Sequence, residues 1–270
     1  MDYAEFSYAN ADHPLLKRWL IRSIEGLSGR RRLLDLYELW RSTSVGVSQN
    51  IWSDLLSLIN LNVAVADGEW PPQNLPDGPL VLIANHPYGI GDGLAILSLA
   101  EQLGRPFRIL INNELLKVPE VRPFSLPVDF EETKDALKTN METRREALRL
   151  LSEGTTIIVF PGGGVATAKK PFGRAQELPW KTFTAKMIRS SRATVLPLYF
   201  DGQNSWLFHL VSRFSLTLRL ALLIREFRRI LGTAITARAG APIPYETLSG
   251  FRDQKEVMDF LQDRVLGLRG

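Results

Sequence analysis

Apolar residues at helical spacing dominate the first quarter of the chain. In residues 14–27 the apolar positions share one face and the charged positions the other, a period that predicts an amphipathic helix. The same period predicts a second helix over residues 33–40 and a third that starts near Ser48, a residue type that caps helix N-termini. Residues 71–79 are rich in proline and other turn formers, so we expect a connector there. The pattern therefore predicts an amphipathic helical segment over residues 1–77.

After the connector, short apolar runs alternate with amphipathic stretches. The apolar runs predict strands at residues 80–84, 107–111, 127–130, 155–160, 194–200 and 234–238. The amphipathic stretches predict helices at residues 93–103, 134–152, 181–191 and 255–266. This alternation indicates an α/β catalytic domain over residues 78–270, with a largely parallel mixed sheet flanked by helices and the N-terminal helical segment packed on it. Pro197 lacks the N–H that a ladder uses, which favours an edge or a bulge for its strand.

The placement of charge is more informative than its total. The 270-residue chain has a net charge of +4 and 45% hydrophobic residues, which suits a globular protein with a core. Residues 13–32 and residues 205–240 each hold six Lys or Arg against one Glu, and both are rich in large apolar residues. Such segments favour an anionic membrane surface over nucleic acid as partner. With no signal-peptide pattern and no apolar run of about 18 residues, we expect a cytoplasmic protein that binds the inner face of the cell membrane peripherally.

Residues 206–227 form the most apolar long stretch of the chain. Its arginines, Arg213, Arg219 and Arg225, recur every six residues and so spread around a helix. Two interpretations stay open. Either the helix lies at a bilayer surface and its Arg side chains reach toward water, or it is partly buried and pairs them with internal carboxylates.

Several kinds of chemistry are excluded by missing residues. The chain has no cysteine, which excludes disulfides, cysteine nucleophiles and thiolate metal sites. Its three histidines, His13, His86 and His209, form no helical pair, so we expect no metal site. Neither a Walker loop nor a Gly-x-Ser-x-Gly motif occurs, and residues 89–94 lack the third glycine of a dinucleotide fingerprint. We therefore expect an activity without a resident cofactor.

The first candidate site follows the predicted strand at residues 80–84. Residues 85–93 read Asn-His-Pro-Tyr-Gly-Ile-Gly-Asp-Gly, and ligands of open α/β sheets gather at the carboxyl ends of strands. If Asp92 faces the imidazole of His86, its carboxylate fixes the tautomer and raises the basicity of the other ring nitrogen. The pair then forms a general base. The alternative is a packing or capping histidine, with Asp92 only as a helix N-cap.

The second candidate site is the glycine turn after residues 155–160. Phe160-Pro161-Gly162-Gly163-Gly164 offers backbone N–H groups that can bind an anion or a developing oxyanion. The alternative is a tight turn that requires a positive φ. Basic residues follow this turn, and they either meet donor phosphates or an acidic carrier protein, or form a solvated surface: Lys169, Lys170, Arg174 and Lys181.

In their order along the chain, these motifs resemble those of the glycerolipid (lysophospholipid) acyltransferase superfamily. That superfamily carries an Asn-His followed by an Asp, then Phe-Pro-Glu-Gly, then an apolar strand with an internal proline. The counterparts here are Asn85-His86 with Asp92, Phe160-Pro161-Gly162-Gly163, and Val195-Leu196-Pro197. The helical start, with Phe6-Ser7-Tyr8-Ala9, resembles the hemolysin-like bacterial branch, which includes enzymes similar to lyso-ornithine lipid O-acyltransferase.

The resemblance implies the glycerolipid acyltransferase fold and acyl transfer to the hydroxyl of a lysolipid. The donor is a thioester co-substrate, either acyl-CoA or acyl carrier protein. His86 is then the general base, Asp92 orients it, and the implied substrate-binding residues are Asn85, Gly89, Phe160, Pro161, Gly162, Gly163 and Gly164. Three alternatives remain: a 1-acylglycerol-3-phosphate acyltransferase, a thioester hydrolase, and a non-catalytic lipid-binding protein on the same fold.

The sequence departs from the superfamily pattern at three points. Five residues rather than four separate His86 from Asp92, and Gly162 replaces the usual Glu, whose role we expect to be lost. Phe130 stands near the position where phosphate-acceptor enzymes use an Arg, which favours an aminolipid over a lysophosphatidate acceptor. Lys117 and Arg122 are nearby candidates to replace that charge at the substrate.

Overall fold

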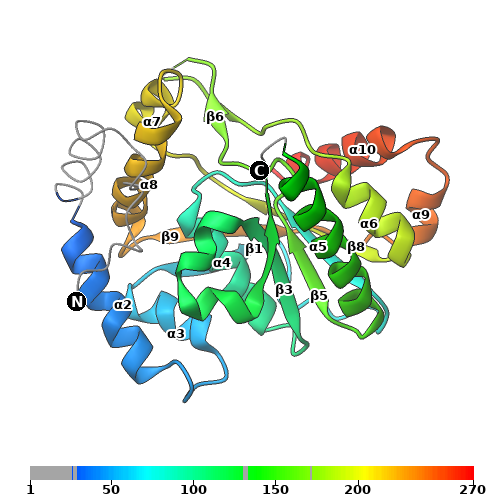
Figure 1. Cartoon of the computed structure of the whole chain (residues 1–270), viewed down its shortest axis with the longest axis horizontal. Helices are drawn as coiled ribbons and strands as arrows, with labels where there is room; N and C mark the ends of the chain where they lie inside the picture. The colour runs from blue at the N-terminus through cyan, green and yellow to red at the C-terminus, as the bar shows by residue number, and fades with distance from the viewer. Residues whose placement is uncertain (1–25, 27–28, 130–132, 171) are drawn as a thin grey trace.

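A computed structural model describes residue 26 and residues 29–129, 133–170 and 172–270. Apart from residue 26, the helix expected at residues 14–27 lies outside the described residues, as does Phe130. A mostly parallel sheet forms the centre of the molecule and carries helices on both faces (Figure 1). The expected α/β fold with a largely parallel mixed sheet is therefore confirmed.

The central sheet has seven strands among the described residues. Their spatial order is β1 (Asn62–Ala66), β9 (Ala234–Ala239), β8 (Thr194–Phe200), β2 (Leu80–Ala84), β5 (Thr156–Val159), β3 (Phe107–Asn112) and β4 (Ser125–Val128). The β8–β9 pair is antiparallel and the other pairs are parallel. A short antiparallel hairpin, β6 (Thr167–Ala168) with β7 (Ala175–Gln176), stands apart from the sheet (Figure 1).

Helices on the two faces of the sheet enclose the two larger of three hydrophobic clusters among the described residues. One group comprises α2 (Arg30–Thr43), α3 (Ile51–Leu58), α4 (Ile90–Glu101) and α8 (Leu216–Ile230). The other comprises α5 (Lys134–Ser152), α6 (Phe183–Ser191), α9 (Tyr245–Ser249) and α10 (Gln254–Leu266). The strand β2 feeds both cores, because Leu80 and Leu82 point to the first group and Val81 and Ile83 to the second. Its continuous apolar run is typical of a central parallel strand.

The segment before residue 78 contributes a strand that the hydrophobic pattern did not predict. The strand β1 pairs in parallel with β9 at one edge of the sheet, through residues that are half-buried or exposed. Helix α3 starts after Asn50, so the expected cap at Ser48 is wrong. Instead, the carboxylate of Glu101 on α4 accepts the N–H groups of Trp52 and Ser53, both at 2.9 Å. A long-range contact thus satisfies the free N–H groups at the start of α3 in place of a local N-cap side chain.

Pro197 lies in the middle of the sheet, so the edge position expected for its strand is wrong. Its strand β8 is hydrogen-bonded to β2 on one side and to β9 on the other. The pairing with β9 covers Leu198 to Phe200, while Val195 pairs with Ile243 in a register that differs by one residue. Pro197 falls between these two pairings, as the bulge alternative requires, and Gly240 donates to its carbonyl (2.9 Å). The missing N–H therefore falls where the ladder is irregular.

The apolar stretch at residues 206–227 folds as two helices, α7 (Trp206–Val211) and α8. The inner side of α8 is buried, and Glu226 on it receives Arg225 and Arg229 at 2.9 Å each. This is the arrangement of a partly buried helix that pairs arginines with an internal carboxylate. Within the described ranges, we find no helix that combines the length and apolar character needed to cross a membrane.

Candidate active site

Three loops meet at the carboxyl ends of the central parallel strands. They are the β2–α4 loop (residues 85–89), the loop that follows β5 (residues 160–166) and the β7–α6 loop (residues 177–182). Backbone hydrogen bonds join them: Ala166 N–H donates to the His86 carbonyl (2.7 Å), and Lys181 N–H donates to the Pro161 carbonyl (3.0 Å). Segments far apart in sequence therefore form one fixed platform.

Asn85 extends the sheet by a side-chain pair. Its Nδ2 donates to the Phe200 carbonyl (2.9 Å), and the Phe200 N–H donates to its Oδ1 (2.7 Å), so the amide imitates one more step of the β2–β8 ladder. Asn85 is buried and both ends of its amide are engaged. It therefore acts on the site by fixing the backbone that carries His86.

His86 and Asp92 face each other as their spacing predicts. His86 Nδ1 lies 3.0 Å from Asp92 Oδ1, and Asp92 Oδ2 accepts the N–H of Tyr88 (2.9 Å). Helix α4 begins at Ile90 rather than near residue 93, so Asp92 lies inside the first helical turn and is not the N-cap. The Asp92 side chain is fully buried at the N-terminal end of α4.

Gly89 shapes the turn that allows the five-residue spacing. It is the residue before α4 and has a φ of 83°, in the left-handed region that L side chains rarely adopt. A Cβ at Gly89 would also lie 3.0 Å from Leu223 Cδ2 and 3.1 Å from Val165 Cγ2. Its role in the structure is to let the loop pass close to α8 and to the loop after β5.

The imidazole of His86 has a second fixed neighbour in Phe160. The two rings stack with centroids 4.1 Å apart and an interplanar angle of 23°, and 18% of the histidine side chain is exposed. Burial lowers the pKa of His86, but the charge and proximity of Asp92 and the charge of Glu177 outweigh it, while Arg219 opposes them. The net effect raises the pKa of His86 above its ordinary value. Because Nδ1 faces Asp92, Nε2 is the ring nitrogen turned away from this carboxylate.

Glu177 is a residue of this site that the sequence did not single out. The N–H of His86 donates to Glu177 Oε1 (2.9 Å), and burial raises the pKa of the carboxyl group. The motif pattern gave no signal for it, because Glu177 lies outside the motifs and reaches His86 only through folding.

The glycine turn adopts the tight conformation that was the alternative for this motif. Gly163 has a φ of 68° and donates its N–H to the Phe160 carbonyl (2.9 Å), so this N–H is used within the turn. The N–H groups of Gly162 and Gly164 have no hydrogen-bond acceptor among the residues that the structure describes. Only these two N–H groups of the turn remain for an anion or an oxyanion.

The basic candidates lie on the 3₁₀ turns after β3 and on the β7–α6 loop. Lys117 ends the 3₁₀ turn η2 (Asn113–Lys117), and Arg122 lies in η3 (Pro119–Phe124), where its Nε donates to the Leu116 carbonyl (2.6 Å). Burial lowers the pKa of Lys181, whose backbone N–H is bound to Pro161.

A cation nearer to the imidazole is Arg219 on α8. Its Nη2 donates to the Val165 carbonyl (2.5 Å), its guanidinium carbon lies 5.5 Å from the Phe208 ring centroid, and its charge acts on His86.

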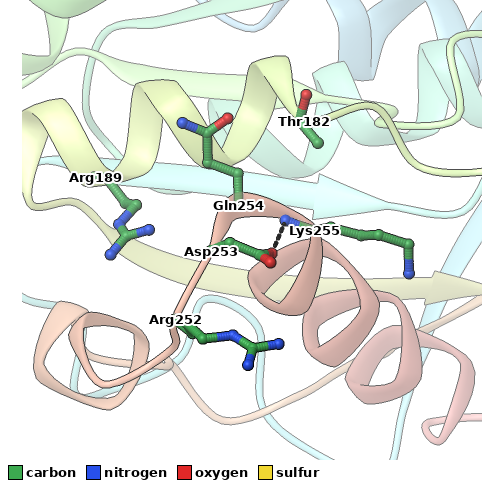
Figure 2. A pocket seen from close by; sticks show the side chains of 6 residues that line it. All are labelled: Thr182, Arg189, Arg252, Asp253, Gln254 and Lys255. Atoms are coloured by element: carbon green, nitrogen blue, oxygen red, sulfur yellow. Dashed lines mark hydrogen bonds between the residues drawn. The ribbon is translucent and has the colours of Figure 1, made fainter.

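A surface hollow of about 430 Å³ lies between α6 and the start of α10, and Figure 2 shows its lining. The residues that line it are Thr182, Arg189, Arg252, Asp253, Gln254 and Lys255. Arg252 and Lys255 each pair with a carboxylate one turn along α10, Glu256 and Asp259. This is the pattern of a solvated helical surface, and the hollow is not formed by the residues around His86.

The fold and the family comparison together identify an acyltransferase. A family model described as Acyltransferase matches residues 64–262, and the chain belongs to this family. Two relatives are lyso-glycine lipid O-acyltransferases. The protein of Phocaeicola vulgatus is 27% identical over 209 residues, which cover 73% of this chain and 71% of the relative. That of Bacteroides thetaiotaomicron is 26% identical over 212 residues, with 73% and 72% covered.

Comparison with a solved structure supports the same fold. The chain is similar to the 1-acyl-sn-glycerophosphate acyltransferase of Thermotoga maritima, with a TM-score of 0.53 and 17% identity over 94% of this chain and 92% of that one. The predicted membership of the glycerolipid acyltransferase superfamily is thus confirmed.

Proposed function

We propose that this protein transfers a fatty acyl group from an acyl thioester to the hydroxyl of a lysolipid, with His86 as general base. The observation that carries the proposal is the His86–Asp92 contact of 3.0 Å at the carboxyl edge of the sheet. A buried carboxylate on Nδ1 holds the tautomer in which Nε2 is free to accept a proton, and it stabilises the imidazolium that forms. General base assistance of this kind contributes about 10²–10⁴ in rate.

The reaction then needs no covalent enzyme intermediate. Nε2 of His86 accepts the hydroxyl proton while the hydroxyl oxygen attacks the thioester carbonyl carbon. The N–H groups of Gly162 and Gly164 have no acceptor among the described residues, so they can donate hydrogen bonds to the resulting oxyanion. The C–S bond then breaks, and the imidazolium returns its proton to the departing thiolate.

For the acceptor, we propose a lyso-aminolipid such as lyso-glycine lipid or lyso-ornithine lipid. The names of the two relatives support this choice, as does Phe130 in place of an arginine near the second motif. A glycine or ornithine head group carries a carboxylate. Arg219 is a cation whose charge already acts on His86, so it is suited to hold that carboxylate close to the reacting hydroxyl.

We also propose that the protein binds the inner face of the cell membrane peripherally. Phe172 and Trp206 stack on each other with ring centroids 5.4 Å apart, and Phe172 is 84% exposed. Phe214, 78% exposed, follows α7, and Lys169 and Lys170 are exposed on the hairpin. We call these five residues the aromatic–basic surface. Exposed aromatic side chains beside lysines suit an anionic bilayer, which would bring lipid to the carboxyl edge of the sheet.

The test of the reaction is thiol release from palmitoyl-CoA and from palmitoyl carrier protein. The acceptors are lyso-glycine lipid, lyso-ornithine lipid, 1-acylglycerol 3-phosphate and none. We expect release that requires a lyso-aminolipid and is lost in His86→Ala, whose folding is checked by circular dichroism. Comparison of the two donors shows which thioester is used. Release without any acceptor would identify a hydrolase instead, and full activity of His86→Ala would overturn the mechanism.

A further inference from the structure

The third motif of this chain lacks its carboxylate, yet the space beside it contains one. Gly162 stands where the superfamily pattern has Glu. A Cβ built on Gly162 would lie 3.3 Å from Glu177 Oε2 and 3.4 Å from the Leu178 carbonyl. The β7–α6 loop therefore brings the carboxylate of Glu177 to the space that a side chain at position 162 would enter.

Glu177 is held there by the same contacts that assemble the site. Its Oε1 accepts the N–H of His86 at 2.9 Å, which fixes the backbone from which the imidazole projects. Its own loop is tied to the glycine turn by the bond between the Lys181 N–H and the Pro161 carbonyl. The Glu177 carboxylate thus binds the histidine motif directly, and its loop binds the glycine motif through the backbone.

The charge of Glu177 also reaches the imidazole. The charged or titratable groups around His86 are Asp92 on α4, Glu177 on the β7–α6 loop and Arg219 on α8. Asp92 and Glu177 raise the pKa of His86, and Arg219 lowers it. Burial raises the pKa of the Tyr88 and Tyr199 phenols, and nearby carboxylates raise it further, so both phenols stay neutral. These carboxylates include Asp92 for Tyr88 and Asp201 and Glu177 for Tyr199.

We infer that Glu177 is a positioning residue for His86, and that it supplies from a neighbouring loop the carboxylate that Gly162 lacks. The inference rests on the proposed function of His86 as the base. Glu177 sets the histidine in two ways: its hydrogen bond fixes the His86 backbone, and its negative charge strengthens the imidazole as a base. The absence of a side chain at position 162 is what makes room for it.

The first experiment separates charge from geometry with Glu177→Gln. The amide oxygen can still accept the His86 N–H, while the negative charge is gone. We expect the titration midpoint of the His86 imidazole, followed by NMR, to fall by about one unit. The chain has only three histidines, so His86→Ala assigns the signal. The acid limb of kcat/KM should move to lower pH by the same amount, because the base loses its proton more easily.

The matched control is Glu101→Gln. Glu101 also accepts backbone N–H groups from another element, those of Trp52 and Ser53, but on the α3 side of the molecule. We expect the control to leave the His86 titration and the acid limb unchanged. A His86 midpoint that does not move in Glu177→Gln would overturn the inference. Since the NMR titration needs no turnover, this outcome is independent of whether the proposed reaction is correct.

The second experiment moves the carboxylate back to the motif position. Glu177→Ala should lose activity, and Gly162→Glu alone should also lose activity, because two acids would then share one space. We expect the double variant Gly162→Glu/Glu177→Ala to recover at least tenfold over Glu177→Ala. A double variant no better than Glu177→Ala, with both folded, would overturn the equivalence of the two positions. The activity of His86→Ala tests the proposed function separately, whatever the result for the Glu177 variants.

Discussion

At the residue scale, the site depends on a buried negative charge placed against one histidine. Asp92 has no exposure to solvent, and its two oxygens serve different partners, His86 Nδ1 at 3.0 Å and the Tyr88 N–H at 2.9 Å. One carboxylate thereby orients the imidazole and fixes the turn that carries it. The substitution that tests this arrangement must remove the charge and keep the shape.

Asp92→Asn is that substitution. We expect kcat to fall by about 10²–10⁴, since the wrong tautomer of His86 is favoured and the imidazolium loses its counter-charge. Asp92 raises the pKa of His86, so the acid limb of any residual activity should move to lower pH. Steady-state kinetics across pH 5–9 would measure both effects. An unchanged acid limb would show that Asp92 does not act on the base.

Arg219 gives a second prediction at this scale. If its guanidinium holds the carboxylate of the acceptor head group, Arg219→Gln should raise KM for the lyso-aminolipid about tenfold and leave kcat nearly unchanged. Arg213→Gln is the control, since Arg213 is an exposed arginine between α7 and α8. Equal effects on KM for the lipid and for the thioester would argue against a head-group role.

At the scale of single elements, the turn between β2 and α4 determines how His86 and Asp92 are placed relative to each other. The helix begins at Ile90, directly after a glycine with a left-handed φ, and this places Asp92 on the first turn beneath His86. With five residues between His86 and Asp92, the turn requires a glycine at position 89 that can adopt a left-handed φ. The positions of His86 and Asp92 in the sequence do not by themselves show this requirement.

Gly89→Ala should destabilise the protein by about 1–3 kcal/mol, because the backbone is strained and the new methyl group meets Leu223 and Val165. Gly93→Ala, within the same helix, has open space and should be neutral or stabilising by up to about 1 kcal/mol. Urea unfolding at equilibrium measures both. Similar stability of the two variants would show that the turn is not constrained.

At the scale of the whole molecule, the aromatic–basic surface lies on the hairpin and α7, across the fold from the α2–α3 connection (Figure 1). His86, the proposed base, lies at the carboxyl edge of the sheet, and the loop after β5 leads from that edge into the hairpin. A membrane bound at the aromatic–basic surface would therefore lie close to the site that needs lipid.

Flotation with anionic liposomes tests this arrangement. We expect the Phe172→Ser/Trp206→Ser double variant to shift most of the protein to the bottom fraction, because two apolar rings no longer enter the interface. Val47→Ser, which removes a 79% exposed side chain between α2 and α3, should float as the parent protein does. If the double variant floated normally, membrane contact would have to use another surface.

Most of the strands and helices of the α/β domain, and the His86–Asp92 pair, could be predicted from local patterns in the sequence. Strand positions such as Leu80–Ala84 and the long helix α5 follow from periodicity, and the meeting of His86 with Asp92 follows from spacing on one short loop. Tertiary structure alone decided the rest: β1 joins the sheet through its pairing with β9, and Glu177 reaches His86 from another loop. Periodicity and motif spacing depend on neighbours within a few residues, whereas these contacts exist only after the order of the strands has brought distant segments together.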